Sequence, residues 1–187
     1  VGSLFGAGMA SFRQRDAVPD NTKRYFAGFL SCQTRTSDGL EAMLGDFFAL
    51  PVRIEEFVGQ WLDIPDGCRF VLGGAPETGS LGSSAPIGSQ VWDCQQKFRV
   101  VFGPLDFADY QRLLPGGASL RRLADLIQNY LGHEWEWDVQ LILKRDQVPP
   151  QLMGSLGCLG WTDWMDHEAL TADADDLILD PSTAPPV

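Results

Sequence analysis

The sequence predicts an α+β fold, with amphipathic helices and short, mainly antiparallel strands joined by long loops. Apolar residues recur with the helical period in some segments and alternate with a period of two in others. The predicted order is helices, strands, helices, strands, and several strands are close enough along the chain to pair antiparallel. This order favours α+β over a doubly wound parallel sheet.

Residues 1–50 are predicted to form a helical segment. A first helix is expected over 21–32, after Asp20, which can cap it. A second begins near Ser37 and ends before Pro51, because a residue that precedes proline avoids the helical region. In the second helix the apolar residues Leu40, Met43, Leu44 and Phe47 recur at positions i, i+3, i+4 and i+7.

Residues 51–165 are predicted to form a mixed α/β region with projecting loops. Its first half contains strands over 52–64, 69–72 and 98–102. The first strand is expected to bend near Gly59, and the last to end at Gly103-Pro104. Residues 73–89, rich in Gly, Ser and Pro, are expected to form a long loop.

The second half of this region begins with two predicted helices, a short one over 106–114 and a strong one from Ser119 to Gly132. The clearest alternating pattern of the chain follows over 135–144 and predicts a strand. A last strand is expected over 158–165. The acidic residues 166–187 are predicted to be a disordered tail, although Leu177-Ile178-Leu179 within it could be a short docking motif.

The charge is acidic and unevenly distributed. The chain has 25 Asp and Glu against 14 Lys and Arg, a net charge of −11. Residues 146–187 contain eight acids and no Lys or Arg, which leaves 25 − 8 = 17 acids against 14 bases in the first 145 residues. A nucleic-acid partner is not expected, because phosphate-binding surfaces need clustered cations. Direct membrane insertion is not expected either, because no apolar run reaches 18 residues.

No catalytic or metal-binding motif in the sequence is complete. His133-Glu134 begins like a zinc motif, but Trp137 stands where the second histidine is needed. Cys94 has no histidine near it in sequence to act as a base. Four widely spaced cysteines could form two disulfides, but free, mostly buried thiols are favoured. We therefore expect no catalytic residue, no cofactor and no metal.

Two alternatives to a structural role stay open at this stage. One is a hydrolase whose site is assembled from distant carboxylates, for which Glu55, Asp93 and Asp138 are the candidates. The other is an adaptor module that binds a peptide or protein. A pocket with convergent, pKa-shifted groups would favour the hydrolase.

The aromatic content is high, with six Trp and eleven Phe. Aromatic residues dominate protein cores and also protein interfaces. Several of them flank the loop over 73–89 or a second loop predicted over 146–157, which suggests contact with a protein partner. The candidate partner-binding residues are Trp61, Glu77, Leu81, Ile87, Trp92, Trp161 and Trp164.

Several segments together resemble the TssG family, also called ImpH or VasB, of type VI secretion baseplate subunits. They include PVRIEEFVGQWLDIP, IGSQVWDCQQKFRVVFGPLDFADYQRLLPGG, WDVQLILKRDQVP and LGWTDWM, and the resemblance covers about residues 13–165 in order. Family members resemble this chain over their C-terminal half. The position of Cys94 usually carries another polar residue in the family, which weakens a catalytic role for it.

The resemblance implies a bacterial, cytoplasmic, non-enzymatic scaffold on the cytoplasmic side of the secretion apparatus. In such baseplates one TssG joins two copies of TssF in a wedge, which recruits TssE and TssK trimers. Six wedges surround the VgrG spike, and TssE couples the wedge to the sheath. We expect the helices around 21–48 to contact TssF, and the loop 73–90 with its flanking strands to dock TssK.

Overall fold

The computed structural model describes residues 2–6, 8, 9, 11, 14–71, 80, 82, 87–149, 158, 160–164 and 170–181. The chain divides into two compact units. The main unit combines Val1–Glu56 with Phe98–Val187, and the hairpin unit is Phe57–Lys97. The predicted divisions after residues 50 and 165 do not coincide with these limits, because the hairpin unit is an insertion between two strands of one sheet.

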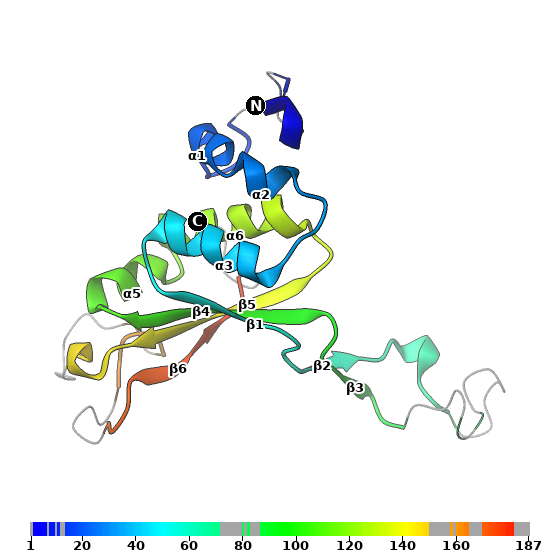
Figure 1. Ribbon diagram of the computed structural model, residues 1–187. Coiled ribbons are helices and arrows are strands. Elements are labelled where there is room, and N and C mark those ends of the chain that lie inside the picture. Colours follow the sequence, from blue (N-terminus) through cyan, green and yellow to red (C-terminus); the bar gives the residue numbers. More distant parts are fainter. Residues whose placement is uncertain are drawn as a thin grey trace. The chain divides into compact units, whose positions relative to one another are not determined.

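Helices and strands follow the expected α+β mixture (Figure 1). The α-helices are α1 (Asp20–Tyr25), α2 (Ala27–Ser31), α3 (Ser37–Phe48), α5 (Phe107–Leu113) and α6 (Ala118–Leu131). The strands are β1 (Val52–Glu55), β2 (Gln60–Asp63), β3 (Gln90–Asp93), β4 (Lys97–Leu105), β5 (Glu136–Leu143) and β6 (Ala174–Leu179). Short 3₁₀ helices are η1 (Gly2–Phe5), η3 (Asp66–Cys68) and η4 (Arg145–Gln147).

The main unit contains a four-stranded sheet with strand order β1-β4-β5-β6. β1 pairs antiparallel with β4, and β6 pairs antiparallel with β5. β4 and β5 run parallel, because the Arg99–Asp138 contact and the Leu105–Lys144 hydrogen bond have the same offset, 138 − 99 = 144 − 105 = 39. The helices α5 and α6 form the crossover that a parallel pair requires.

The core of the main unit lies between this sheet and its helices. In Figure 1, α3 and α6 lie over one face of the sheet. Alternate residues of the strands point to that face and meet the apolar stripes of both helices. The core includes Leu40, Met43, Leu44 and Phe48 of α3, Leu123, Leu126 and Ile127 of α6, and Val100, Phe102, Val139 and Leu141 of the sheet.

Side-chain and backbone caps explain the ends of α3. Thr36, one residue before the predicted start, accepts a hydrogen bond from the amide of Gly39 at 3.1 Å. The helix ends at Phe48, where Ala49 takes a left-handed conformation with φ of 55°. The predicted helix over 21–32 is instead two short helices that meet at Phe26.

Several sequence predictions of strands are wrong in their limits. The strand expected over 52–64 is β1 and β2, which belong to different sheets. β4 does not end at Gly103-Pro104 but continues through a cis peptide bond to Leu105. The close approach of the neighbouring strand requires glycine at position 103. A Cβ there would lie 2.6 Å from the Cβ of Ile142, which is too close.

Two further predicted strands are absent from the described residues. Residues 69–71 continue from η3 without strand pairing, and of the described residues 158 and 160–164, residues 160–162 form a turn. Trp161 donates from its backbone amide to the carbonyl of Cys158 at 3.0 Å, which closes that turn. Residue 72 and residue 165 lie outside the described residues.

The prediction of a disordered tail is wrong for β6. Leu177 and Leu179 are buried against β5, and Ala174 is buried beside Leu143. The acidic side chains Asp175 and Asp176 are exposed in the same strand. This acidic segment therefore contains an edge strand with three buried apolar residues. Leu177-Ile178-Leu179 belongs to that strand.

The hairpin unit is built on the antiparallel pair β2–β3. The amide of Val58 donates to the carbonyl of Lys97 at 3.0 Å, and the amide of Ile64 donates to Ser89 at 2.8 Å. These bonds extend the pairing at both ends of the strands. Most of the predicted loop over 73–89 lies outside the described residues. No helix in the described part of the chain is long and apolar enough to cross a membrane.

Candidate interaction surfaces

The hairpin unit presents two tryptophans side by side. Trp61 on β2 and Trp92 on β3 are cross-strand partners, so their side chains share one face of the pair. Their ring centroids are 5.3 Å apart in an edge-to-face arrangement. The side chains are nevertheless 63% and 54% exposed. A pair of large aromatic rings is thus held in a defined geometry and left open to solvent.

Gly59 sets the position of Trp92. A Cβ at residue 59 would lie 1.9 Å from Cζ2 of Trp92 and 2.5 Å from its Cε2. The indole therefore lies directly on the backbone of Gly59, where any other residue would displace it. Asp93, next to Trp92, accepts a hydrogen bond from the amide of Gln95 at 3.3 Å and stabilises the turn before β4.

Other apolar side chains of the hairpin unit are exposed as well. Ile87 is 82% exposed, and Phe57, Val71 and Val91 are exposed too. Phe57 has a left-handed backbone conformation with φ of 59°, which is uncommon for a bulky residue. Sequence reasoning named Ile87 and missed Phe57, because nothing in the local pattern signals a positive φ.

A second exposed apolar surface lies on α1 and α2 of the main unit. Tyr25 is 73% exposed and Phe29 is 40% exposed, whereas Phe26 between them is buried. Phe26 contacts both rings, with centroids 4.9 Å from Tyr25 and 6.4 Å from Phe29. Hydrogen bonding and the charge of Asp46 raise the pKa of Tyr25. The sequence placed these rings on a helix but did not distinguish the buried from the exposed ones.

Polar contacts attach α2 and its following loop to α6. Arg35 donates to the carbonyls of Phe29 at 2.6 Å and Leu30 at 3.0 Å, which satisfies the C-terminal end of α2. Its guanidinium also lies 5.0 Å from the centre of the Tyr130 ring on α6. The Tyr130 hydroxyl accepts from the amide of Thr36 at 3.1 Å and donates to its carbonyl at 3.2 Å.

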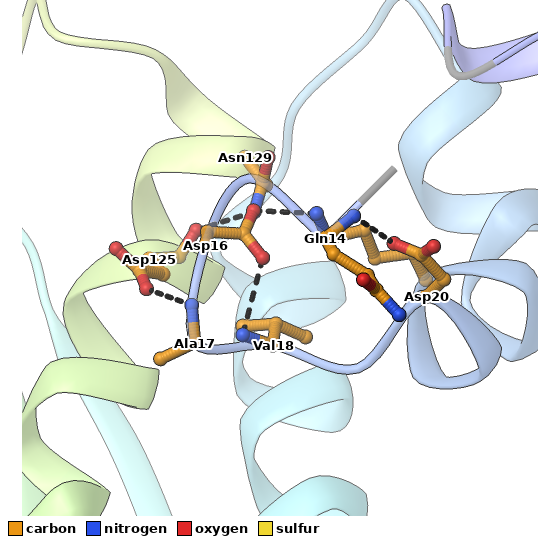
Figure 2. A network of polar contacts seen from close by, with 8 residues as sticks. Gln14, Asp16, Ala17, Val18, Asp20, Asp125 and Asn129 are labelled. Atoms are coloured by element: carbon orange, nitrogen blue, oxygen red, sulfur yellow. Dashed lines mark hydrogen bonds and ion pairs between the residues drawn. The ribbon is translucent and has the colours of Figure 1, made fainter. Parts of the chain in front are cut away.

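Asp16 is the centre of the network that holds the segment before α1 (Figure 2). Its carboxylate accepts hydrogen bonds from Asn129 of α6 at 2.9 Å and from the amide of Val18 at 3.1 Å, and forms an ion pair with Lys23. Asp125 of α6 accepts from the amide of Ala17 at 2.6 Å. These contacts fix the position of α1 against α6.

The ionised state of Asp16 is favoured in this network. Burial by itself raises the pKa of the carboxyl group, but the bonds from Asn129 and Lys23, the charge of Lys23 and the amide of Val18 lower it by more. The net effect is a pKa below the ordinary value. The network is therefore a structural anchor whose strength depends on a charged carboxylate.

The remaining predicted partner-binding residues differ in their surroundings. Trp161 and Trp164 pack against the core of the main unit. The indole nitrogen of Trp164 donates to Asp176 at 3.2 Å, and the hydroxyl of Tyr110 donates to the carbonyl of Trp161 at 2.8 Å. Both tryptophans thus make internal contacts. Glu77 and Leu81 lie outside the described residues.

The three carboxylates considered for a hydrolase all have structural contacts. Asp138 forms a bidentate pair with Arg99, at 2.6 Å and 3.0 Å, and its side chain is 3% exposed. Glu55 pairs with Arg53 at 2.6 Å. Asp93 belongs to the hairpin unit, whereas Glu55 and Asp138 belong to the main unit.

The cysteines are exposed thiols, contrary to the predicted burial. All four cysteines are free, as favoured, but all four are exposed, so the prediction that they are mostly buried is wrong. Cys94 lies in the turn between β3 and β4, where its backbone is set by that turn rather than by packing. Among the described residues, no group of three His, Cys, Asp or Glu is placed to hold a metal ion.

Comparison with known proteins identifies the family. Residues 1–166 match the family model described as type VI secretion, TssG. The fold is similar to a chain in the cryo-electron microscopy structure of the type VI secretion system TssK-TssF-TssG baseplate subcomplex, with a TM-score of 0.67 and 19% identity. That similarity covers 87% of this chain and 67% of the other.

A chain in a structure of the baseplate complex from the type VI secretion system is similar too. Its TM-score is 0.64 at 19% identity, covering 96% of this chain and 51% of that one. This chain thus spans about half the length of that relative. No curated protein sequence matches. Because the family model covers 166 of the 187 residues, the chain belongs to the TssG family of type VI secretion proteins.

Proposed function

We propose that this chain is a structural subunit of the type VI secretion baseplate wedge. In this role it binds TssF and docks TssK and TssE through protein–protein contacts on the cytoplasmic side of the apparatus. The fold similarity to chains of solved baseplate complexes supports the role. The observation that carries it is the pair of exposed aromatic surfaces, one on each unit, in a chain of the TssG family.

The hairpin unit is the proposed docking element for TssK. Exposed tryptophans with fixed geometry are typical of interface hot spots, because they bury much area at low entropic cost. Trp61 and Trp92 form such a pair, and Ile87 is a further exposed apolar residue. Glu77 and Leu81 belong to the same unit. The chain enters and leaves the unit at Glu56–Phe57 and Lys97–Phe98.

The surface of α1 and α2 is the proposed contact with TssF. Within the predicted stretch 21–48, α3 faces the core of the main unit, whereas Tyr25 and Phe29 are exposed. The anchors at Asp16 and Arg35 hold the two short helices against α6, so that these rings are presented on a fixed support. The proposal also includes two copies of TssF per wedge and the recruitment of TssE. Contact with the VgrG spike and the sheath is indirect.

A non-enzymatic role is part of the proposal. The carboxylates Glu55 and Asp138 each form an ion pair with an arginine, so a structural role accounts for both of them. No observation in the described residues brings a nucleophile and a base together. The hydrolase is therefore not supported as a second function.

The experiment is co-expression with TssF, TssK and TssE, followed by size-exclusion chromatography and mass measurement. The expected result is a complex that contains all of the partners. A double Tyr25→Ser, Phe29→Ser variant should lose TssF, whereas deletion of residues 75–86 should lose TssK and keep TssF. Each variant is the control for the other. A folded wild-type chain that binds none of the three proteins would refute the proposal.

A further inference from the structure

One face of the β2–β3 pair combines the two tryptophans with an acid. Side chains alternate along a strand, and Trp61 pairs with Trp92 while Asp63 pairs with Gln90. These four side chains, the Trp–Asp face, therefore lie on the same side of the pair. All four residues are exposed. The opposite side carries Leu62 and its cross-strand partner Val91.

Asp63 has a neutral partner but no cationic one in the described part of the chain. Gln90 Nε2 donates to its Oδ1 at 2.9 Å, which fixes the carboxylate beside the tryptophans, and Oδ2 accepts no hydrogen bond from the described residues. The nearby Arg69 is engaged elsewhere, because it pairs with Asp66 at 2.6 Å and donates to the carbonyl of Ile64 at 2.8 Å. The Trp–Asp face thus has a negative charge and two aromatic rings, and no described residue supplies it with a counter-ion.

We propose that the Trp–Asp face binds an arginine side chain of the protein partner that docks on the hairpin unit. This deepens the proposed docking function and rests on it. Residues two apart in a strand are about 6.6–6.8 Å apart, so one side chain can reach both the Trp61 ring and the Asp63 carboxylate. A cation within about 6 Å of an indole centre is attracted by its π face. The carboxylate adds a charge-assisted hydrogen bond.

Arginine fits this face better than the alternatives. Its planar guanidinium stacks on an aromatic ring and donates in a fork to a carboxylate, whereas the lysine ammonium is a compact and strongly hydrated charge. A wholly apolar partner would leave Asp63 desolvated without a cation, which is unfavourable. The net charge of −11 opposes a nucleic acid as the source of the contact.

The first test probes the chemistry without the partner. The full chain, labelled with ¹⁵N, is titrated with the tripeptide Ac-Gly-Arg-Gly-NH₂ and, as a control, with its glutamine analogue. The indole NH signals of Trp61 and Trp92 are followed. They should shift with the arginine peptide and not with glutamine, and Asp63→Asn should reduce the shift by up to about fivefold. Equal responses to the two peptides would overturn the proposal.

The second test measures binding to purified TssK. Asp63→Asn and Trp61→Ala should each weaken the affinity about tenfold, as substitutions at a hot spot do. The matched controls are Asp66→Asn, which removes an exposed acid already paired with Arg69, and Val71→Ala, which trims an equally exposed apolar side chain. Both should bind like wild type. Wild-type affinity in a folded Asp63→Asn variant would overturn the proposal.

The two tests separate this inference from the docking function. Arginine-specific shifts in a chain that does not bind TssK would leave the Trp–Asp face intact as an arginine site, but would refute TssK as its partner. Binding of TssK without arginine-specific shifts would support the docking function and refute the inference. Retained dispersion of the amide spectrum shows that each variant is folded.

Discussion

Replacing Asp138 by asparagine should destabilise the main unit more than any change at its surface ion pairs. Asp138 on β5 holds Arg99 on β4 through two hydrogen bonds, of 2.6 Å and 3.0 Å. The side chains are 3% and 20% exposed, respectively. Hydrogen bonding to Asp138 raises the pKa of Arg99. The guanidinium stays charged when this partner is removed, because arginine is protonated in proteins even without such a contact.

The expected magnitude follows from leaving that charge without its partner. Removing one member of a buried ion pair costs about 3–5 kcal/mol. Two features reduce this cost here: Arg99 keeps some contact with water, and Glu55 is its cross-strand partner on β1. We therefore expect a loss of about 2–3 kcal/mol. For a chain of this length, that corresponds to a fall in Tm of about 4–12 °C.

Urea unfolding followed by circular dichroism measures this loss of free energy. The control is Arg53→Met, which removes the exposed Arg53–Glu55 pair and should cost less than about 1 kcal/mol. The double variant Arg99→Met, Asp138→Leu should return to within about 1 kcal/mol of wild type, because no charge is left buried. A loss below about 0.5 kcal/mol in Asp138→Asn would show that the pair is solvated and that the reasoning is wrong.

Three further predictions concern single sites. Gly59→Ala should displace the Trp92 ring and alter its indole NMR signal, whereas Gly67→Ala, where a Cβ meets nothing within 4 Å, should not. Asp16→Asn should remove stability at neutral pH and flatten its dependence on pH, measured by urea titrations from pH 7 to pH 2. The reason is that the pKa of Asp16 is lowered in the folded state. The stability that Asp16 contributes is therefore fully present above the pKa of the unfolded chain, about 3.9, and is lost as the pH falls through the lower pKa of the folded chain. Leu123→Ala, at a fully buried position, should cost about 2–5 kcal/mol in the same unfolding assay, and a smaller loss would contradict close packing between α6 and the sheet.

Elements with a complete local pattern were predictable from the sequence. In α3 and α6 the buried residues recur with the helical period, and in β5 they alternate. Because each of these elements packs one stripe or one face on the core, the pattern along the chain reports the burial directly. The resemblance to the TssG family depended on the ordered set of segments and is confirmed by the family match.

Elements whose structure depends on distant partners were not predictable in this way. β6 is acidic on its exposed side, and its apolar residues become informative only when paired with β5. β4 passes through Gly103-Pro104 because the carbonyl of Pro51, just before β1, accepts from the Gly103 amide, and Ile142 of β5 lies where a side chain at position 103 would be. Local rules treat that dipeptide as a strand end, and the tertiary contacts override them.

The candidate surfaces were predictable in residue type but not in exposure. Trp61, Trp92 and the pair Trp161 and Trp164 have the same local signal, an aromatic residue beside a long loop. The first two are exposed on a two-stranded sheet, whereas the other two pack against the core of the main unit. Exposure is decided by whether another layer covers the residue, and that depends on the fold of the whole unit.

The hairpin unit links the packing of this chain to its proposed docking role. An isolated pair of strands is at best marginally stable in water, and this pair has two large rings on one face. Trp92 gains contact by lying on Gly59, and Gln90 ties Asp63 across the strands, so the unit holds its own shape at the position of the rings. Both groups remain open on their outer side. A partner that covers the rings therefore buries apolar surface that is already ordered. Binding then does not have to offset the entropic cost of ordering these side chains.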